Sequence, residues 1–217
     1  MPQANNSKLY LGGICVLMDC SGRARPPFDS IIDLIGAGVK WVQLRDKEAT
    51  RLAVYKAARL LKELTKANGL TLIINDYADI AAAIDADGVH LGQDDLPLSE
   101  ARKILGADKL IGISTHNLEQ AVKAQEDGAD YIGFGPIYAT STKKAGPPKG
   151  PQSIKEIRNH IHIPIAAIGG INEENVAELI EAGADALAVA SAVMDAEDIS
   201  KAADAFVTFV TRLKTSQ

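Results

Sequence analysis

Eight short apolar segments recur along the chain, and longer amphipathic stretches separate them. They span residues 13–18, 41–44, 70–74, 88–91, 110–113, 131–134, 164–168 and 186–189. Segments of this length with almost no polar interruption are typical of strands that are buried on both faces, as in a parallel sheet covered by helices. We therefore predict a chain in which strands and helices alternate.

The entries into four of these segments resemble one another. Residues 38–41 read Gly-Val-Lys-Trp, 86–89 Ala-Asp-Gly-Val, 128–131 Gly-Ala-Asp-Tyr and 183–186 Gly-Ala-Asp-Ala, and each is interpreted as a helix end that turns into a strand. No linker rich in Ser, Gly or Pro divides the 217 residues near the middle. A single closed (β/α)8 TIM barrel with parallel strands is therefore favoured over an open doubly wound sheet. We expect a polar tail at residues 1–8 and one TIM-barrel catalytic domain at residues 9–217.

Local signals predict helix ends and helix faces. Asn117 with Gln120 predicts a capping box, and Asn172 is expected to be the N-cap of the helix that follows it. In the stretch 50–67, apolar residues at helical spacing are expected to face the sheet: Ala53, Ala57, Leu60, Leu61 and Leu64. The longest irregular stretch, 135–150, is the first candidate for a functional lid.

The charge balance limits the partners. The chain has 23 basic and 28 acidic residues, a net charge of -5, which is the wrong sign for a protein that coats nucleic acid or an anionic membrane. Its apolar stretches are shorter than the roughly 20 residues that span a bilayer. Cys15 and Cys20 lack the spacing of a zinc site and are expected to be reduced thiols. We expect a cytoplasmic protein that holds any anionic ligand through a local cluster of groups.

In such a barrel the residues just past each strand form the active site. The second strand is followed by the run Gln43-Leu44-Arg45-Asp46-Lys47. Because side chains alternate along an extended segment, Gln43, Arg45 and Lys47 are expected on one side, where an amide and two cations converge on the barrel mouth. The alternative is a solvated charge run that opens the next helix.

Carboxylates follow the next two strands. Asp76 comes after the third strand, beside Asn75, and Asp95 comes after the fourth. Adjacent parallel strands lie about 5 Å apart, so these two carboxylates are expected to share one hard cation, and Mg²⁺ is the natural choice. The alternative is that each Asp caps its own helix.

Polar residues also follow the fifth strand. Ser114 is expected to donate a hydrogen bond to a phosphate. His116, two residues later, is a candidate acid or base but is more simply interpreted as a loop histidine. His90, at the end of the fourth strand, is interpreted as a packed residue.

The loops after the sixth, seventh and eighth strands contain residues that can bind a second anion. Residues 140–144 read Thr-Ser-Thr-Lys-Lys, and their hydroxyls and cations suit a lid over a polyanion. The seventh and eighth strands are followed by Gly169-Gly170 and Ala190-Ser191, small residues that let backbone N–H groups approach a phosphate. The alternatives are a solvated loop and a glycine pair needed only for a tight turn.

Together these groups describe two phosphate sites. Arg45, Lys47 and Lys143 with the carboxylate pair form a diphosphate–magnesium site, and the seventh and eighth loops form a separate monophosphate site. A reaction that fits this layout loses diphosphate from one substrate and joins the remainder to a second phosphorylated substrate, while the cations stabilise the charge on the leaving group. It requires no nucleophilic side chain, and no Ser-His-Asp or Cys-His set, P-loop or dinucleotide fingerprint is recognisable in the sequence.

Six strings carry these groups along the chain. They are residues 43–47 (QLRDK), 75–76 (ND), 88–95 (GVHLGQDD), 135–138 (GPIY), 140–143 (TSTK) and 168–171 (IGGI). In this order they resemble the thiamine-phosphate synthase family, and the resemblance runs from about residue 14 to residue 192. It implies that hydroxymethylpyrimidine diphosphate is joined to the phosphate of hydroxyethylthiazole, giving thiamine phosphate and diphosphate by a dissociative mechanism with Mg²⁺ as cofactor.

The resemblance also implies roles for individual residues. The pyrimidine diphosphate would be bound by Gln43, Leu44, Arg45, Asp46, Lys47, Asn75, Ser114 and Lys143. The metal would be held by Asp76 and Asp95. The thiazole phosphate would be held by Thr140, Ser141, Thr142, Gly170, Ala190 and Ser191. The catalytic residues among them, Arg45, Lys47, Ser114 and Lys143, would act by electrostatics and positioning.

Two departures from the family pattern and two alternative functions stay open. Tyr77 stands where the family often has Arg, and residues 20–25 match no pattern of the family. A thiazole tautomerase with the same barrel has less need of a magnesium pair, and His116 would be its residue to watch. A non-catalytic phosphate-binding barrel would keep Gly170 and Ser191 and lose the diphosphate cluster. The oligomeric state does not follow from the sequence.

Overall fold

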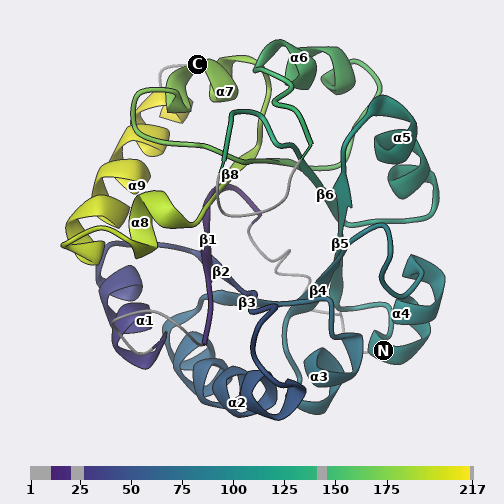
Figure 1. The fold of residues 1–217 in the computed structure, drawn as a ribbon, viewed down its shortest axis with the longest axis vertical. Coiled ribbons are helices and arrows are strands. Elements are labelled where there is room, and N and C mark those ends of the chain that lie inside the picture. The colour runs from purple at the N-terminus through teal and green to yellow at the C-terminus, as the bar shows by residue number, and fades with distance from the viewer. Residues whose placement is uncertain (1–10, 21–26, 141–145, 216–217) are drawn as a thin grey trace, which may run out of the picture.

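Eight parallel strands close into a barrel in the computed structural model, which describes residues 11–20, 27–140 and 146–215 (Figure 1). The strands are β1 (Gly13–Met18), β2 (Trp41–Leu44), β3 (Thr71–Asn75), β4 (Gly88–Leu91), β5 (Leu110–Thr115), β6 (Tyr131–Phe134), β7 (Ile165–Ile168) and β8 (Ala186–Val189). Each pairs with the next in the chain, and β8 pairs with β1. This closure confirms the barrel and excludes the open sheet. The tail predicted at residues 1–8 lies outside the described residues.

The predicted strands agree closely with the observed ones, and the differences have a physical cause. The predictions for β1, β2, β4, β6 and β8 match to the residue. Strand β3 extends to Asn75 because that residue pairs with His90, and β5 extends to Thr115 because Ser114 and Thr115 pair with β6. The last residues of these two strands are therefore polar, and they belong to the sheet rather than to the loops that follow.

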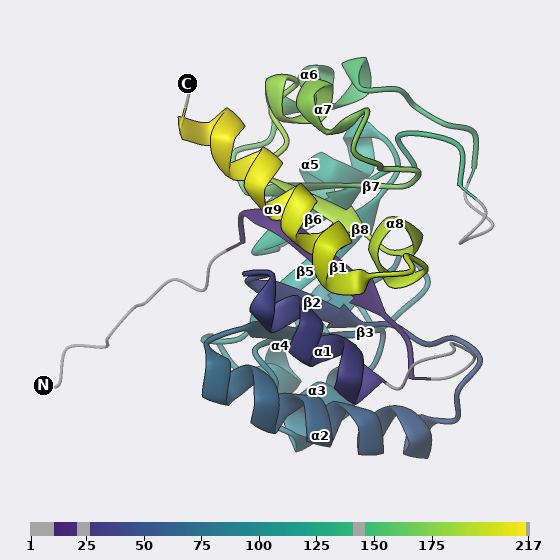
Figure 2. The same ribbon diagram turned by 90° about the vertical axis from the view of Figure 1, so that its left-hand side faces the viewer.

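Helices follow the strands and cover the outside of the barrel. They are α1 (Pro27–Gly36), α2 (Arg51–Asn68), α3 (Ala78–Ala83), α4 (Leu98–Leu105), α5 (Leu118–Glu126), α6 (Gln152–Arg158), α7 (Val176–Glu181), α8 (Ser191–Met194) and α9 (Ile199–Thr215). Helix α9 lies across the outside of β1 and contacts α1 and α7 (Figure 2). No helix in these segments is both long and apolar enough to cross a membrane.

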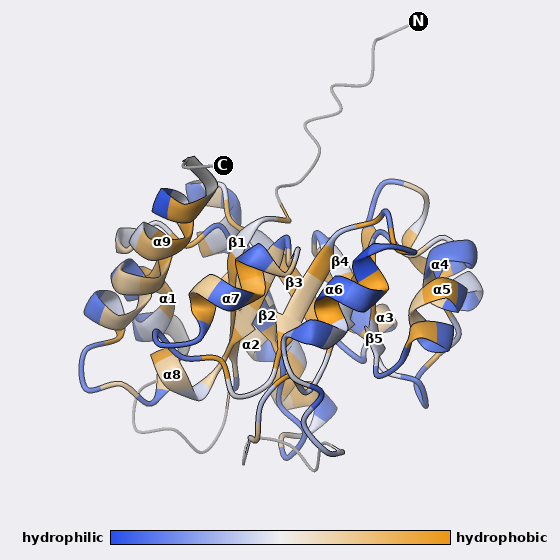
Figure 3. Cartoon of the chain, turned by 90° about the horizontal axis from the view of Figure 1, so that it is seen from above, coloured by the Kyte–Doolittle hydropathy of each residue, from blue (hydrophilic) through white to orange (hydrophobic). Residues whose placement is uncertain are grey.

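Alternation along the strands produces two apolar layers. One set of strand side chains packs against the helices, whose hydrophobic residues face the barrel while hydrophilic residues face outward (Figure 3). The other set fills the barrel interior: Cys15, Leu17, Trp41, Ile73, Tyr131, Ala166, Ala186 and Ala188. Trp41 and Tyr131 are the largest of these inward side chains, and the three alanines from β7 and β8 are the smallest.

Two predictions about helices are wrong in detail. Helix α2 buries the set Val54, Ala58, Leu61, Lys62 and Thr65, and Leu60 is 55% exposed. Leu61 is buried as predicted, and Ala57 and Leu64 are partly buried against the core, whereas Ala53 and Leu60 are exposed. The predicted set missed Val54 and Ala58 because it was rotated on the helix, and it missed Lys62 and Thr65 because they are polar. Asn172 accepts a hydrogen bond from the Glu174 N–H in a turn, whereas the N-cap of α7 is Asn175.

The capping box before α5 is present in modified form. Asn117 Oδ1 accepts a hydrogen bond from the Gln120 N–H at 2.8 Å, as predicted. Gln120 Oε1 reaches back to the N–H of His116, one residue beyond the position that the capping box predicts. The cap therefore also fixes the backbone at His116.

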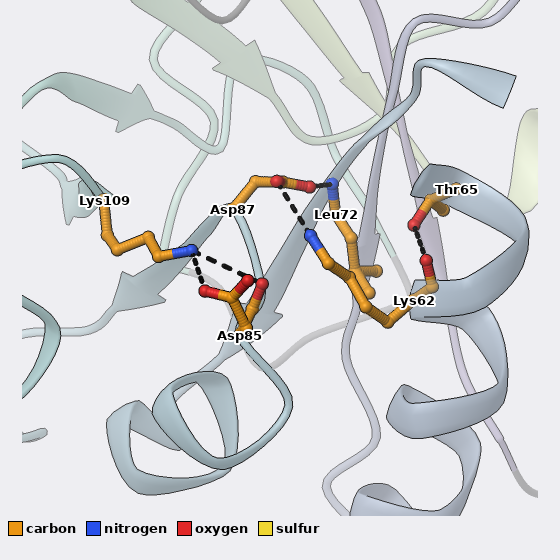
Figure 4. A network of polar contacts seen from close by, with 6 residues as sticks. All are labelled: Lys62, Thr65, Leu72, Asp85, Asp87 and Lys109. Carbon is orange, nitrogen blue, oxygen red and sulfur yellow. Dashed lines mark hydrogen bonds and ion pairs between the residues drawn. The ribbon is translucent and has the colours of Figure 1, made fainter. Parts of the chain in front are cut away.

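An aspartate near the start of β4 joins three elements. Asp87 Oδ2 accepts a hydrogen bond from the Leu72 N–H of β3 at 2.8 Å, and Asp87 Oδ1 lies 2.9 Å from Lys62 Nζ of α2 (Figure 4). Only 11% of the Lys62 side chain and 20% of the Asp87 side chain are exposed. The ion pair therefore ties helix α2 to the amino-terminal end of the barrel, opposite the end where a barrel's active site forms.

The same arrangement recurs at two of the other three repeats, whereas the repeat at residues 38–41 has Lys40 in place of the Asp. Asp130 accepts from the Ile111 N–H and pairs with Arg102, and Asp185 accepts from the Ile165 N–H and pairs with Arg158. The repeated Asp thus connects β3 to β4, β5 to β6 and β7 to β8. The repeated Asp is a structural feature and does not line the pocket described below, whereas Trp41 and Tyr131, which end two of the repeats, do line it.

Substitution of Lys62 tests this stabilising role. Lys62→Met keeps the aliphatic stem but leaves Asp87 without its cation, so the free energy of unfolding should fall by about 2 kcal/mol. In the matched variant Lys109→Met, which breaks a pair with Asp85 whose carboxylate is 79% exposed, the loss should be about 0.5 kcal/mol. Urea denaturation measures both, and equal losses would contradict the account.

Candidate active site

One pocket opens at the carboxyl ends of the strands, and every strand or the residues after it contribute to its lining. Trp41, Tyr131 and the alanines of β7 and β8 lie at its floor inside the barrel. The Trp41 Nε1 atom is buried there without a hydrogen-bond partner among the described residues. A buried donor of this kind suits a ligand or water oxygen or nitrogen at the floor of the pocket.

The pocket collects most of the residues predicted from the sequence. Those that line it are Gln43, Arg45, Lys47, Asn75, Asp76, Ser114, Thr140, Gly170, Ala190 and Ser191. Ser141, Thr142 and Lys143 lie outside the described residues. Residues from β2 to β4 face those from β6 to β8 across the barrel because these strands stand on opposite sides of the closed sheet.

Strand β2 divides its polar run between two faces, as alternation predicts. Gln43, Arg45 and Lys47 line the pocket. Leu44 is 1% exposed and belongs to the apolar layer under the helices, so its side chain faces away from the pocket, and its part in substrate binding stays a prediction. The physical reason is that adjacent residues of a strand point to opposite faces.

Asp46 is also outside the pocket lining, and its part in substrate binding stays a prediction. Its Oδ2 accepts hydrogen bonds from the Cys20 backbone N–H at 3.0 Å and from the Cys20 thiol at 3.3 Å. Its Oδ1 accepts from the N–H groups of Glu48 and Ala49. Asp46 therefore ties the segment after β1 to the turn before α2. Burial, followed by the hydrogen bond and the charge of Asp46, raises the pKa of the Cys20 thiol to about 12, so this thiol stays protonated at neutral pH.

The two predicted metal ligands are neighbours. The Asp76 and Asp95 carboxyl groups are in hydrogen-bond contact although β3 and β4 carry them separately. Burial, together with Asp95, raises the pKa of Asp76, and Lys47 opposes this shift from 3.0 Å away. Neither α3 nor α4 has a side-chain N-cap hydrogen bond, so neither carboxylate serves as the helix cap that was the alternative.

Backbone contacts fix both carboxylates in place. The Asp76 N–H donates to the His90 carbonyl at 2.8 Å, which continues the β3–β4 ladder one residue past the strand. Asp76 adopts φ 65°, a left-handed conformation that Asp tolerates better than most residues. Asp95 Oδ2 accepts from the Gly92 N–H at 2.6 Å. Two adjacent carboxylates beside an open pocket fit Mg²⁺, which takes one or two carboxylates and fills its shell with phosphate oxygens and water.

The glycines after β7 admit a close approach of the loop after β6. The Ile137 N–H donates to the Ile168 carbonyl at 2.9 Å, so the start of that loop lies against the end of β7. Gly170 has φ 65°, and a Cβ atom there would lie 2.5 Å from the Ala139 carbonyl oxygen. The pair is thus required for more than a tight turn, because a side chain at Gly170 would push this loop away from the pocket.

Comparison with known proteins agrees with this geometry. Residues 14–193 match the sequence model of a family described as thiamine monophosphate synthase. The chain belongs to this family. It is 49% identical over 176 residues to the thiamine-phosphate synthase of Shouchella clausii, covering 81% of this chain and 84% of that protein. It is 50% identical over 170 residues to the thiamine-phosphate synthase of Chloroflexus aurantiacus, covering 78% of each.

A solved structure supports both the family and the fold. The thiamine phosphate pyrophosphorylase from Pyrococcus furiosus superposes with a TM-score of 0.84 at 34% identity, covering 92% of this chain and 96% of that one. The thiamine phosphate pyrophosphorylase from Bacteroides thetaiotaomicron, at 18% identity and a TM-score of 0.68, shows the shared fold alone.

Two histidines of the pocket, His90 and His116, have contacts that the sequence did not predict. His90 was interpreted as a packed residue, and it is buried, but its ring also hydrogen-bonds to Tyr131 and Ser114 within the pocket. His116 lines the pocket and its Nδ1 lies 2.7 Å from the Gly135 carbonyl oxygen, so Nδ1 carries the proton. A signal for His90 was available, because it is a polar residue at an inward-facing position of a buried strand.

The revised role of Asp46 is testable by its effect on stability. Asp46→Ala removes the acceptor for three backbone N–H groups, so the free energy of unfolding should fall by about 2 kcal/mol. Asp94→Ala, at an exposed position in the loop after β4, should change it by less than about 0.5 kcal/mol. Thermal and urea unfolding measure both. If Asp46→Ala keeps its stability but no longer binds inorganic diphosphate, Asp46 is a ligand-binding residue and the structural role is wrong.

Proposed function

We propose that this chain is a thiamine-phosphate synthase, a transferase that joins hydroxymethylpyrimidine diphosphate to the phosphate of hydroxyethylthiazole. The products are thiamine phosphate and diphosphate. One observation carries the proposal: Lys47 and Asp76 line one pocket together with Gly170, and the Asp76 carboxyl group contacts that of Asp95, which lies behind the lining. This is the arrangement that two phosphorylated substrates require, and membership of the family supports it.

The diphosphate of the first substrate would be bound at the β2–β4 side. Arg45 presents a planar guanidinium that suits two phosphate oxygens, and Lys47 presents a point charge. Lys143 would join them from the loop after β6. Because Lys47 lies 3.0 Å from Asp76, its ammonium is already held at the rim before substrate arrives, so little reorganisation is needed on binding.

The proposed chemical step uses these positive charges. The C–O bond to diphosphate breaks and its electron pair leaves with the diphosphate, whose added negative charge Arg45, Lys47 and Lys143 stabilise. The pyrimidine-stabilised cation that remains is captured by the thiazole nitrogen, which forms the new C–N bond. Gln43, Asn75 and Ser114 would orient the pyrimidine for this attack. No side chain becomes covalently attached.

The carboxylate pair would hold the metal. Asp76 and Asp95 would coordinate Mg²⁺ together with diphosphate oxygens and water, and when bound the ion would neutralise charge on the leaving group. Among the residues described, no cluster of three or more His, Cys, Asp or Glu side chains is suited to a metal. In this proposal Asp76 and Asp95 supply the carboxylate ligands, and the substrate and water complete the shell.

The second substrate would bind at the β6–β8 side. Backbone N–H groups near Gly170, Ala190 and Ser191 and the hydroxyl of Thr140 would hold its phosphate, with Ser141 and Thr142 from the same loop. The two phosphate groups would thus be held on opposite sides of the barrel. This separation places the reacting carbon and nitrogen between them, over the floor of the pocket.

The direct test is an assay with both precursors. Purified protein with hydroxymethylpyrimidine diphosphate, hydroxyethylthiazole phosphate and Mg²⁺ should form thiamine phosphate and diphosphate in equal amounts, and EDTA should stop the reaction until excess Mg²⁺ is restored. Isomerisation of a thiazole phosphate without coupling would favour the tautomerase alternative. Binding of both ligands without any reaction would favour the non-catalytic barrel.

Substitution of one carboxylate tests the proposed metal ligands. Asp76→Asn keeps the size of the side chain and a residue type that tolerates the positive φ, so the fold should persist while turnover falls about 100-fold, roughly 3 kcal/mol of transition-state stabilisation. Asp79→Asn, three residues later in an exposed ion pair with Arg51, is the matched control and should keep full turnover. Equal activity of the two variants would show that Asp76 does not have this role.

A further inference from the structure

Four hydrogen-bonded side chains cross the floor of the pocket, and two of them have no role in the proposed reaction so far. The Gln43 side chain hydrogen-bonds to the Tyr131 hydroxyl. The Tyr131 hydroxyl oxygen lies 3.0 Å from His90 Nδ1, and His90 Nε2 lies 2.9 Å from Ser114 Oγ. The chain of contacts therefore runs from β2 through β6 and β4 to β5, and it ends at a hydroxyl that lines the pocket.

The surrounding backbone is shaped to hold the two rings. A Cβ atom on Gly112 would lie 2.1 Å from Tyr131 Cζ, and one on Gly133 would lie 3.0 Å from His90 Cε1. Trp41 packs edge-on against the Tyr131 ring, with ring centroids 5.4 Å apart and an interplanar angle of 83°. Any larger residue at Gly112 would displace Tyr131, so the ring positions are set by the barrel itself.

The tautomer of His90 decides which atoms donate and which accept along this chain. Burial raises the pKa of Tyr131 well above its ordinary value, so its hydroxyl is protonated and has one hydrogen to donate. His90 Nδ1 lies 3.0 Å from the Tyr131 hydroxyl oxygen, and it is the acceptor when the Tyr131 hydrogen is directed to it. A neutral imidazole that accepts at Nδ1 carries its proton on Nε2, which donates to Ser114 Oγ. The Ser114 hydroxyl, having accepted this bond, directs its own hydrogen into the pocket.

We propose that Tyr131 and His90 are positioning residues that act through Ser114 and fix its hydroxyl as a hydrogen-bond donor to the pyrimidine diphosphate. The proposal rests on the proposed function for the identity of the ligand. It specifies that the substrate atom at Ser114 is an acceptor, a ring nitrogen or a phosphate oxygen. Without His90, the Ser114 hydroxyl could rotate and accept from the substrate or turn to water, and the fixed orientation would be lost.

Amide substitutions of His90 separate this role from simple packing. The Gln side chain places its terminal amide near the position of Nε2 and keeps a donor for Ser114, whereas Asn places its amide near Nδ1 and does not. We expect kcat to fall about tenfold in His90→Asn and about twofold in His90→Gln, with KM for the thiazole phosphate unchanged in both. Equal kcat in the two variants would overturn the proposal, because packing alone does not distinguish which end of the imidazole is replaced.

A double-mutant cycle tests whether His90 acts through Ser114. In a Ser114→Ala background, adding His90→Asn should lower kcat by less than about twofold, since the hydroxyl that His90 orients is absent. If the fold-loss in kcat of the double variant equals the product of the fold-losses of the two single variants, His90 acts independently of Ser114 and the proposal is overturned. Tyr55→Phe on helix α2, outside the barrel, removes a hydroxyl away from the pocket and should leave kcat unchanged.

A spectroscopic measurement keeps this inference separate from the proposed function. In unliganded protein labelled with ¹⁵N-histidine, long-range ¹H–¹⁵N spectra should show His90 as the Nε2–H tautomer, and Tyr131→Phe should introduce the Nδ1–H tautomer. An Nδ1–H tautomer in the unsubstituted protein overturns the proposal whatever the enzyme catalyses. The Nε2–H tautomer in a protein that forms no thiamine phosphate would support the orientation of Ser114 while the proposed function fails.

Discussion

The hydrogen bonds between β8 and β1 are the constraint on which the site depends, because they close the sheet and bring eight strand ends into one ring. Residues far apart in the chain then become neighbours without any direct signal between them. The β3–β4 register pairs Asn75 with His90, and the next backbone hydrogen bond runs from Asp76 to the same His90. This single register places Asp76 beside the loop that carries Asp95, and it also sets His90 at the pocket floor.

The barrel interior explains why there is a pocket at all. In a packed barrel the inward side chains fill the centre, but here Ala166, Ala186 and Ala188 face the rings of Trp41 and Tyr131. The three alanines leave room for a ligand, and the rings of Trp41 and Tyr131 pack against each other at the floor of the pocket. The protein therefore separates stability from chemistry: the repeated Asp ion pairs hold the amino-terminal end, and polar groups gather at the carboxyl end.

The sequence was sufficient for features that depend on a local period or on barrel topology. Alternation placed Gln43, Arg45 and Lys47 on one face, and parallel closure placed Asp76 near Asp95. It was insufficient where a distant partner decides the role of a residue. The sequence alone suggests that Asp46 is one more charge at the pocket. In the structure its carboxylate accepts a hydrogen bond from the N–H of Cys20, 26 residues earlier. The sequence alone suggests that His90 is only a packed residue. In the structure its ring hydrogen-bonds to the hydroxyl of Tyr131, 41 residues later. Contacts between residues so far apart follow no regular spacing, so a single sequence does not reveal them.

The central claim is that the Asp76–Asp95 pair and the cations beside it form one centre for a divalent ion and a diphosphate. Water-proton relaxation with Mn²⁺ in place of Mg²⁺ measures this directly in the presence of inorganic diphosphate. The account predicts one tightly bound Mn²⁺ per chain that requires diphosphate, with affinity at least about tenfold weaker in Asp95→Asn. Undiminished Mn²⁺ affinity in that variant, or binding that is indifferent to diphosphate, would contradict it.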